Sequence, residues 1–505
     1  MVFLRSGKVL DFHVPNIRTL ELHLLQLIMR CLLILAVVSS QIGRADTVSL
    51  PDIGDSSGST ISPGEEKEVG ESLLRYFRKN NLIVDDPVVQ DYIQDLGYRL
   101  AAHSDQPDQP FTFFVVRDPA INAFAAPGGY IGVHSGLILT AQNESELAAV
   151  IAHEIAHITQ KHMARMYESA SKHRYTAAIA LLAAILIGQQ STEAAQAALA
   201  TGVAADAQMQ INFTRGNEKE ADFIGIKTLA QAGFDPSSMA DFFERMQQST
   251  RLYGDELPEF LRTHPVTENR IAESRARARN MHVEKIADSR NFFIIQAHLR
   301  VSQVQDITQF LRDYEKKENT DTVKNDQYLY TLALANNRAG RYAAALQAIT
   351  PLVSKDPNRI AYRITQAQIQ LAAGQGQDAL KNYTQLLGIY PNNHAITINY
   401  ASALFTLGQK QKAYEVLRDY SRNRELDAPG LKLYADIAGA AGNQGEAYFA
   451  LAEYQLQNGD IHQAIQQLER AQKLPDLDYY LSSKIEARLQ ELKEELSRET
   501  KNAKK

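Results

Sequence analysis

Cysteine is almost missing from this sequence of 505 residues, and the single example, Cys31, lies in a segment that we expect to be removed. A chain without thiols has no disulfide framework and no cysteine-ligated metal. The formal net charge is -6. Blocks of basic residues are missing as well, apart from Lys501, Lys504 and Lys505 in a short terminal tail. This balance argues against nucleic acid as the main partner.

Long apolar runs are also lacking, because no stretch approaches the roughly 20 apolar residues that a transmembrane helix needs. This absence argues against a membrane-embedded protein. Residues 176–187 form a shorter apolar stretch, for which we favour a buried core helix over a lid or an element in peripheral contact with a membrane. Residues 189–210 are rich in Ala, Gln and Thr, and they predict either a mobile flap or a surface helix.

The first 45 residues have the features of a signal peptide in the expected order. Arg30 precedes the apolar residues 31–38, and residues 43–45 supply the small side chains that a signal peptidase reads. We therefore expect residues 1–45 to be removed on export, with Met29 as an alternative translation start. The competing interpretation is an N-terminal helix of the fold.

Hydrophobic periodicity predicts a mainly α-helical chain with a small β-sheet or hairpin. Residues 46–64 are rich in turn-forming types and predict an irregular leader, after which helical periodicity extends over 65–100. The β-branched and aromatic residues 111–116 predict a strand. The Pro-Gly-Gly turn at 127–129, between two strand-like halves, predicts a hairpin, and helices are expected over 144–246.

A repeat of 34 residues marks the C-terminal part. Its glycines and alanines recur in the order Gly340, Ala345, Gly374, Ala379, Gly408, Ala413, Gly442 and Ala447. This period, with a turn glycine and a small residue at the helix contact, is typical of the tetratricopeptide repeat. Glycine permits a tight turn between helices, and each helix pair then buries its apolar face against the next pair. The alternative is a non-repetitive helical bundle.

The motif that carries chemistry is His153-Glu154-Ile155-Ala156-His157, in a stretch without Pro or Gly that predicts one helix. Residues four apart lie on one helix face, so the imidazoles of His153 and His157 can bind one tetrahedral zinc ion. Glu154 lies beside them, where it can activate a water at the metal. A chance pair on a polar face is disfavoured, because Ile155 and Ala156 indicate a buried helix, in which histidines need partners.

A tetrahedral catalytic zinc needs a third protein ligand, and Glu218 is the candidate. Glu218 and Asp222 lie on one helix face, so Glu218 can bind the ion while Asp222 supports the site or donates a proton. Glu220 is about 200° around the helix from Glu218 and should face elsewhere. Taken alone, these acids would predict a solvated helix face, but the two histidines make ligation the better hypothesis.

Other histidines are weaker candidates. His162 lies nine residues after the first histidine of the motif, which turns it away from the site if the helix continues. His134 and His173 have no partner pattern and are interpreted as surface or hydrogen-bonded side chains. His264 precedes Pro265, which disfavours helix. A loop would then present its imidazole to the open zinc position or to an oxyanion, and a structural His-Pro turn is the equal alternative.

Together these segments resemble a known family. The motif at 153–157, the acids at 217–222, the stretch Asn-Ala-Phe-Ala-Ala-Pro-Gly-Gly at 122–129 and residues 263–271 look like the gluzincin family of CAAX prenyl proteases and heat-shock membrane proteases. With an expected signal peptide in place of membrane helices, and repeats behind, the chain is most similar to periplasmic members of that family.

The resemblance implies a gluzincin zinc metallopeptidase domain followed by an α-solenoid of tetratricopeptide repeats, with one zinc ion per chain. His153, His157 and Glu218 would be the zinc ligands, Glu154 the catalytic acid/base, and Asp222 a supporting residue or proton donor. The implied role is periplasmic endoproteolysis with chaperone-like activity, which promotes assembly of some outer-membrane β-barrel proteins and degrades stalled ones. The implied partners are such proteins and, through the repeats, the outer-membrane assembly machinery.

The expected order of segments follows from these features. It comprises a signal peptide (1–45), a leader (46–64), a zinc metallopeptidase domain (65–285), a helical linker (286–320), a repeat domain (321–490) and a charged tail (491–505). In the mechanism that we expect, Glu154 deprotonates water while Asp222 or His264 assists the developing charge or the leaving amine. The rival function is a repeat-based binding adaptor in which proteolysis is secondary. The hairpin either offers an edge strand to an extended substrate or is an ordinary internal hairpin.

Overall fold

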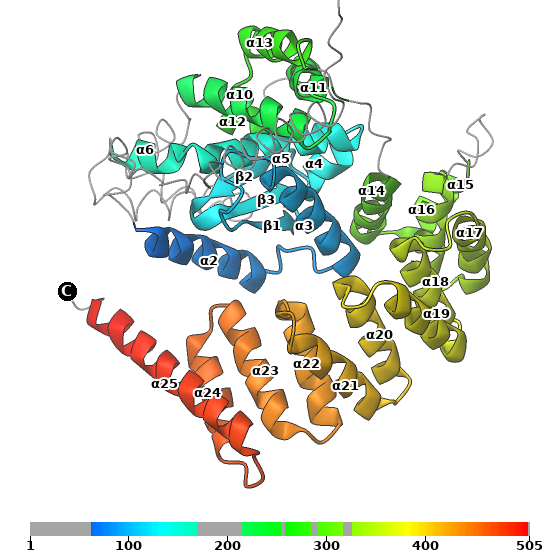
Figure 1. Cartoon of the computed structure of the whole chain (residues 1–505). Helices are drawn as coiled ribbons and strands as arrows, with labels where there is room; N and C mark the ends of the chain where they lie inside the picture. Colours follow the sequence, from blue (N-terminus) through cyan, green and yellow to red (C-terminus); the bar gives the residue numbers. More distant parts are fainter. Residues whose placement is uncertain are drawn as a thin grey trace, which may run out of the picture. The chain divides into compact units, whose positions relative to one another are not determined.

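The computed structural model shows a mainly helical chain with one small sheet (Figure 1). It describes residues 62–168, 215–253, 258–281, 283, 290–316 and 326–502. The segments 1–45, 176–187 and 189–210, on which several predictions fall, lie outside the described residues, as does His173. None of the described helices is long and apolar enough to cross a membrane.

The N-terminal part surrounds the sheet with helices. Its elements are α2 (Pro63–Lys79), α3 (Pro87–Ala101), β1 (Thr112–Val116), β2 (Ala123–Ala126), the 3-10 turn η2 (Pro127–Gly129), β3 (Tyr130–His134), α4 (Ser135–Thr140), α5 (Glu144–Thr159), α6 (His162–Glu168), α10 (Arg215–Gln231), α11 (Ser237–Tyr253), α12 (Glu259–Thr263) and α13 (Glu268–Ala278). The helical periodicity over 65–100 is interrupted, because Asn81 adopts a left-handed φ of 56°. A new helix then begins at Pro87, capped by the Asp86 side chain.

The sheet has the strand order β1-β3-β2, with β1 parallel and β2 antiparallel to the central β3. The predicted strand and hairpin are therefore confirmed. Glycine is required at the hairpin turn, because Gly128 and Gly129 have φ of 76° and 86°. A Cβ at Gly129 would also lie 2.0 Å from the carbonyl oxygen of Pro110. The turn leaves β2 as an edge strand.

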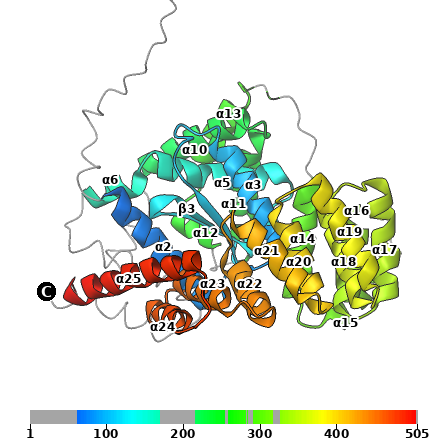
Figure 2. The same ribbon diagram turned by 60° about the horizontal axis from the view of Figure 1, so that its bottom comes forward.

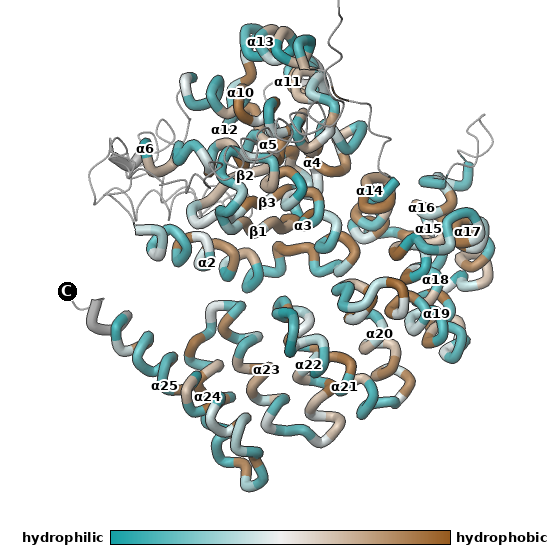
Figure 3. The backbone as a smooth tube through the Cα atoms, in the orientation of Figure 1, coloured by the Kyte–Doolittle hydropathy of each residue, from teal (hydrophilic) through white to brown (hydrophobic). Residues whose placement is uncertain are grey.

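Two helix layers cover the two faces of the sheet (Figure 1). Ile131 and Val133 belong to the large core that α3 and α5 share, whereas the alternate side chains Phe124 and Tyr130 pack with Phe77 of α2. This alternation follows from the two-residue period of a strand. Coloured by hydropathy, the sheet and α5 are mostly brown, whereas α2 and α13 contain many teal residues (Figure 3). A sheet buried on both faces thus supports the apolar helix α5.

The C-terminal part continues as antiparallel helix pairs. Its elements are α14 (Arg290–Gln303), α15 (Ile307–Lys316), α16 (Asp326–Arg338), α17 (Tyr342–Lys355), α18 (Ile360–Ala372), α19 (Gly376–Ile389), α20 (His394–Thr406), α21 (Lys410–Ser421), α22 (Ala428–Ala440), α23 (Gln444–Gln457), α24 (Ile461–Gln472) and α25 (Tyr479–Asn502). Each helix from α16 to α25 contacts the next one along the chain, and the rotated view shows this stacking in sequence order (Figure 2).

The repeat residues occupy the positions that their chemistry demands. The glycines after the first helix of each pair all adopt positive φ, with values of 73° at Gly340, 79° at Gly374, 76° at Gly408 and 90° at Gly442. The alanines five residues later, at 345, 379, 413 and 447, are buried. The helix pairs therefore turn at glycine and approach each other at alanine, which confirms the predicted repeat architecture.

Helix α3 connects the two parts through polar contacts. Its N-cap Asp86 accepts a 2.7 Å hydrogen bond from the ring Nδ1 of His298 on α14. The Asp91 carboxylate accepts the backbone N–H of Ala395 at 3.2 Å, at the first turn of α20. A carboxylate at a helix N-terminus satisfies an otherwise unpaired donor. One face of α3 therefore contacts the sheet while another side of the helix caps a repeat helix.

The repeat turns give a stability prediction with a matched control. Gly408→Ala should lower the free energy of unfolding of the repeats by about 1 kcal/mol, because an L side chain is strained at this φ. A Cβ meets nothing within 4 Å at Gly408 or at Gly388, so packing does not separate the two sites. Gly388 lies inside α19, and Gly388→Ala should raise stability by about 0.5–1 kcal/mol. Equal effects of the two substitutions in urea unfolding would contradict the turn assignment.

Candidate metal centre

The two histidines of the motif lie on a helix that is buried on all sides. Helix α5 is capped by Asn143, whose side chain accepts the N–H of Glu146 at 2.9 Å, and most of its residues are buried. Its apolar surround leaves His153 and His157 almost completely inaccessible, at 0% and 1% exposure. Buried imidazoles need polar partners, and the carboxylates that contact these two come from outside α5.

Helix α10 supplies those partners because it lies unusually close to α5. A Cβ at Gly225 would lie 3.1 Å from the backbone nitrogen of His153, so a larger residue there would push the two helices apart. Asp222 and Glu218, one and two turns earlier on the same helix, are buried as well, at 1% and 2% exposure. The close approach places both carboxylates against the imidazoles of α5.

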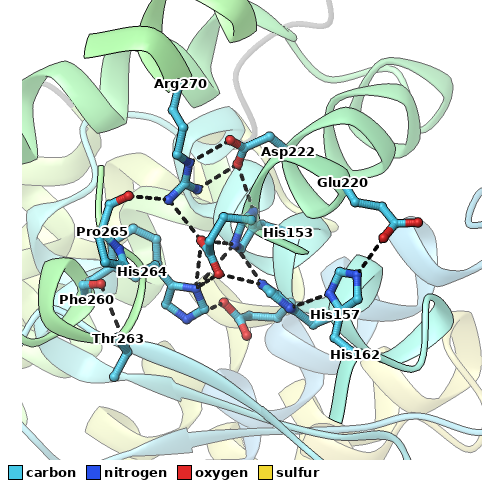
Figure 4. Close-up of polar contacts among 12 residues, drawn as sticks. His153, His157, His162, Glu220, Asp222, Phe260, Thr263, His264, Pro265 and Arg270 are labelled. Atoms are coloured by element: carbon cyan, nitrogen blue, oxygen red, sulfur yellow. Dashed lines mark hydrogen bonds and ion pairs between the residues drawn. The ribbon is translucent and has the colours of Figure 1, made fainter. Parts of the chain in front are cut away.

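Four side chains converge on one point in the structure (Figure 4). The Nε2 atoms of His153 and His157 lie 3.0 Å apart, and each is 3.5 Å from a carboxylate oxygen of Glu218. The Nδ1 atom of His264 lies 3.4 Å from Nε2 of His153 and 3.2 Å from the Glu218 carboxylate. One donor atom from each of the four residues lies within 4.8 Å of every other.

This arrangement fits a zinc ion in donor type and in spacing. A tetrahedral zinc with bonds of about 2.0–2.1 Å holds its ligand atoms about 3.3–3.4 Å apart, and the five separations given above are 3.0 to 3.5 Å. Imidazole nitrogen and carboxylate oxygen are zinc ligands, and all four groups are buried together. The predicted ligands His153, His157 and Glu218 are thus brought together, with His264 beside them.

Asp222 orients the first histidine from behind. Its carboxylate lies 3.1 Å from Nδ1 of His153, which leaves Nε2 directed at the cluster. Arg270 of α13 binds both oxygens of Asp222, at 2.7 and 2.8 Å, and lies 2.9 Å from Glu218. A buried guanidinium thus holds two acids in one geometry. The sequence predicted the support role of Asp222 but gave Arg270 no role beyond the family resemblance.

The electrostatics of the cluster favour a bound cation. Burial alone would lower the pKa of His153, but the nearby carboxylates of Asp222 and Glu218 raise it to about 9. Burial would likewise raise the pKa of Glu218, but His264 and His153 hold it well below its usual range. A site that stabilises positive charge against a burial penalty is suited to a divalent cation.

Glu154 lies beside the cluster without belonging to it. It is 1% exposed, and burial raises the pKa of its carboxyl group. The nearby backbone N–H of Ala125 in strand β2 opposes this rise in pKa, and Oε1 of Glu154 lies 3.6 Å from Nε2 of His264. A buried acid with a raised pKa, close to the metal position but outside the donor set, has the properties of a general base.

Two expectations about neighbouring side chains need correction, those for His162 and His134. His162 does not point away, because its Nδ1 lies 2.8 Å from Nδ1 of His157. Glu220 faces away from the four donors as expected, and it lies 3.1 Å from Nε2 of His162. His134 is neither exposed nor hydrogen-bonded, since it is 1% exposed and both of its ring nitrogens are without hydrogen-bond partners. Burial lowers its pKa to about 4.

Comparison with known proteins agrees with this geometry. Residues 87–278 match the model of peptidase family M48, and residues 287–453 match a tetratricopeptide repeat model. The chain is 36% identical over 464 residues to the putative beta-barrel assembly-enhancing protease of Vibrio cholerae, covering 92% of this chain and 96% of the relative. It is 34% identical over 480 residues to the beta-barrel assembly-enhancing protease of Escherichia coli strain K12, covering 94% and 97%.

Another relative is similar over a shorter stretch. The mitochondrial metalloendopeptidase OMA1 of Schizosaccharomyces pombe is 34% identical over 204 residues, which are 40% of this chain and 55% of that protein. The chain therefore belongs to peptidase family M48 and is a metalloendopeptidase with tetratricopeptide repeats. Within the family it groups with the beta-barrel assembly-enhancing proteases, to which it is similar along nearly its whole length. The peptidase function is favoured over the adaptor alternative.

Proposed function

We propose that this chain is a zinc-dependent endopeptidase of the bacterial envelope that acts on outer-membrane β-barrel proteins during their assembly. The observation that carries the proposal is the convergence of two imidazoles and the Glu218 carboxylate beside a buried Glu154. The names of the relatives support the substrate class and the envelope location. The repeats are proposed to bind these substrates or the outer-membrane assembly machinery.

The proposed roles follow from what each side chain contacts. His153, His157 and Glu218 would hold the zinc ion, which when bound polarises a carbonyl and acidifies water. Glu154 takes the proton from the attacking water, because burial makes its carboxyl group a stronger base than an exposed one. Asp222 holds a proton on Nδ1 of His153 at 3.1 Å, so that Nε2 keeps its lone pair for the ion.

The proposed base can be tested by a nearly isosteric substitution. Glu154→Gln should lower cleavage of casein by about 10²–10⁴-fold, because the amide cannot accept a proton. Zinc content and the melting temperature should stay near those of the parent. Glu244→Gln on the exposed side of α11 is a suitable control, and it should leave cleavage unchanged. Parent-like cleavage by Glu154→Gln would refute this role.

Strand β2 is proposed to pair with an extended substrate. It is the edge strand of the sheet, and the hydrogen bond from His134 N–H to the Asn122 carbonyl assigns the inward-facing backbone groups to even-numbered residues. The odd-numbered residues Ala123 and Ala125 therefore direct their backbone groups away from β3, and Ala125 lies close enough to Glu154 to affect the pKa of its carboxyl group. Main-chain pairing along this edge would place a scissile bond beside the base with little dependence on sequence.

A substitution on this edge separates substrate pairing from folding. Ala123→Pro removes one N–H that takes no part in the β2–β3 ladder, and because Ala123 is only 1% exposed, a melting temperature equal to that of the parent is the control for folding. The KM for unfolded protein substrates should rise severalfold with zinc affinity unchanged. Ala123→Ser keeps the N–H and should behave like the parent. An unchanged KM in the proline variant would argue for an ordinary internal hairpin.

His264 is proposed to close the fourth zinc position in the resting enzyme. Its Nδ1 lies within the four-donor cluster, and it is only 2% exposed. An imidazole there would exclude the water that Glu154 must activate, so the ring has to leave before cleavage. This role would keep an envelope protease inactive until a substrate displaces the ring.

Counting imidazoles at the metal tests this gate directly. X-ray absorption of the zinc-loaded protein should show three histidine ligands, and His264→Ala should show two with an added oxygen. His103→Ala, at an exposed histidine on the surface, should leave the count at three. A resting parent with two imidazoles and a water would overturn the gate and leave the role of Glu154 untouched.

A further inference from the structure

The chain changes direction immediately after the metal-binding helix. Helix α5 ends at Thr159, Lys161 adopts a left-handed φ of 51°, and α6 begins at His162. Left-handed backbone at a residue other than glycine is uncommon and costs about 1 kcal/mol or more. The turn brings His162 back beneath His157, whereas a continuous helix would have carried it to the opposite face. The left-handed turn at Lys161 therefore fixes the position of the His162 imidazole beside His157.

His162 joins His157 to a carboxylate on helix α10. Its Nδ1 lies 2.8 Å from Nδ1 of His157, and its Nε2 lies 3.1 Å from the Glu220 carboxylate. Arg165, one turn into α6, lies 3.2 Å from the same oxygen of Glu220. The His162 side chain is 0% exposed, whereas that of Glu220 is 38% exposed. The contacts form a chain from the buried ligand to the surface, which Figure 4 shows as far as Glu220.

Hydrogen-bond chemistry gives this chain one direction. When Nε2 of His157 is a metal ligand, the neutral ring carries its proton on Nδ1 and must donate it. Nδ1 of His162 is then the acceptor, so the proton of His162 lies on Nε2 and is donated to Glu220. A carboxylate at the far end can only accept, which matches this order. At His153 no intermediate histidine is present, because the Asp222 carboxylate lies 3.1 Å from Nδ1 of His153 itself.

We propose that His162, anchored by Glu220, is a positioning residue that holds His157 in the tautomer and orientation required for metal binding. The inference rests on the proposed zinc function and adds two residues that do not touch the metal. Each ligand histidine of α5 would thus be held by an acid of α10, directly for His153 and through His162 for His157. Loss of such an outer partner typically lowers metal affinity 10–100-fold.

Substitution of His162 by Asn or by Gln tests the roles of its two ring nitrogens separately. The Asn side-chain oxygen can occupy the place of Nδ1, and the Gln side-chain nitrogen that of Nε2. His162→Leu should lower zinc affinity 10–100-fold, measured by competition with a chromophoric chelator. His162→Asn should recover most of this loss because it still accepts from His157, whereas His162→Gln should recover little. The visible absorption of bound Co²⁺ should change with Leu and Gln and stay close to the parent with Asn.

A surface substitution tests the anchor without disturbing the core. Glu220→Ala should lower zinc affinity by a smaller factor than His162→Leu, and the two effects should not add. Glu273→Ala is the matched control, because Glu273 is similarly exposed at 37% and pairs with Lys219 at 2.8 Å. If His162→Leu folds poorly, the Asn and Glu220 variants still decide the question.

The outcomes distinguish this inference from the proposed function. Parent-like zinc affinity and Co²⁺ absorption in His162→Leu, or an Asn variant no better than Leu, would overturn the positioning role while leaving a working zinc peptidase. A parent chain that binds no zinc at all, or whose cleavage is insensitive to chelator, would instead refute the proposed function. Loss of zinc in Glu273→Ala equal to that in Glu220→Ala would show a nonspecific charge effect and would also overturn the anchor.

Discussion

Two carboxylates are buried side by side in this protein, and the centre depends on how their charge is neutralised. Glu218 and Asp222 are almost inaccessible, and unpaired buried carboxylates would take up protons and lose their ability to bind a cation. Arg270 prevents this by contacting both acids. One guanidinium contacts both acids and so fixes their positions. Its single positive charge offsets only one of the two negative charges, and the remaining negative potential acts on the imidazoles of α5.

Helix α10 organises the centre through alternate residues. Glu218 reaches the donor cluster, Asp222 reaches His153, and Glu220 reaches His162 from a different side of the helix. Acids on two sides of α10 can both contact the centre only if the chain turns back after the end of α5. Lys161 provides that bend with its positive φ. Asp222 contacts His153 directly, whereas the contact of His162 with His157 requires both the turn at Lys161 and the position of Glu220 on α10.

Local patterns predicted the elements whose cause is local. The spacing of His153 and His157 on one helix, the hairpin at 127–129 and the glycine turns of the repeats all follow from backbone periodicity and glycine conformation. His162 was misplaced because one residue in left-handed conformation, at a lysine, breaks the helical phase without a glycine or proline to signal it. Arg270 has no local signature either, since its role arises only when α13 packs against α10. Tertiary packing therefore decided the outer contacts of the centre.

The four candidate ligands differ in how firmly the fold holds them. His153 and His157 belong to a 16-residue buried helix, and Glu218 is fixed by Arg270 at 2.9 Å. His264 follows the five-residue helix α12, where its N–H bonds the Phe260 carbonyl and its ring stacks on Phe260 at 5.0 Å. Moving His264 disturbs one short turn, its stacking on Phe260 and its contacts within the donor cluster, whereas moving any other donor also displaces a long buried helix. If one ligand yields to substrate, the fold singles out His264.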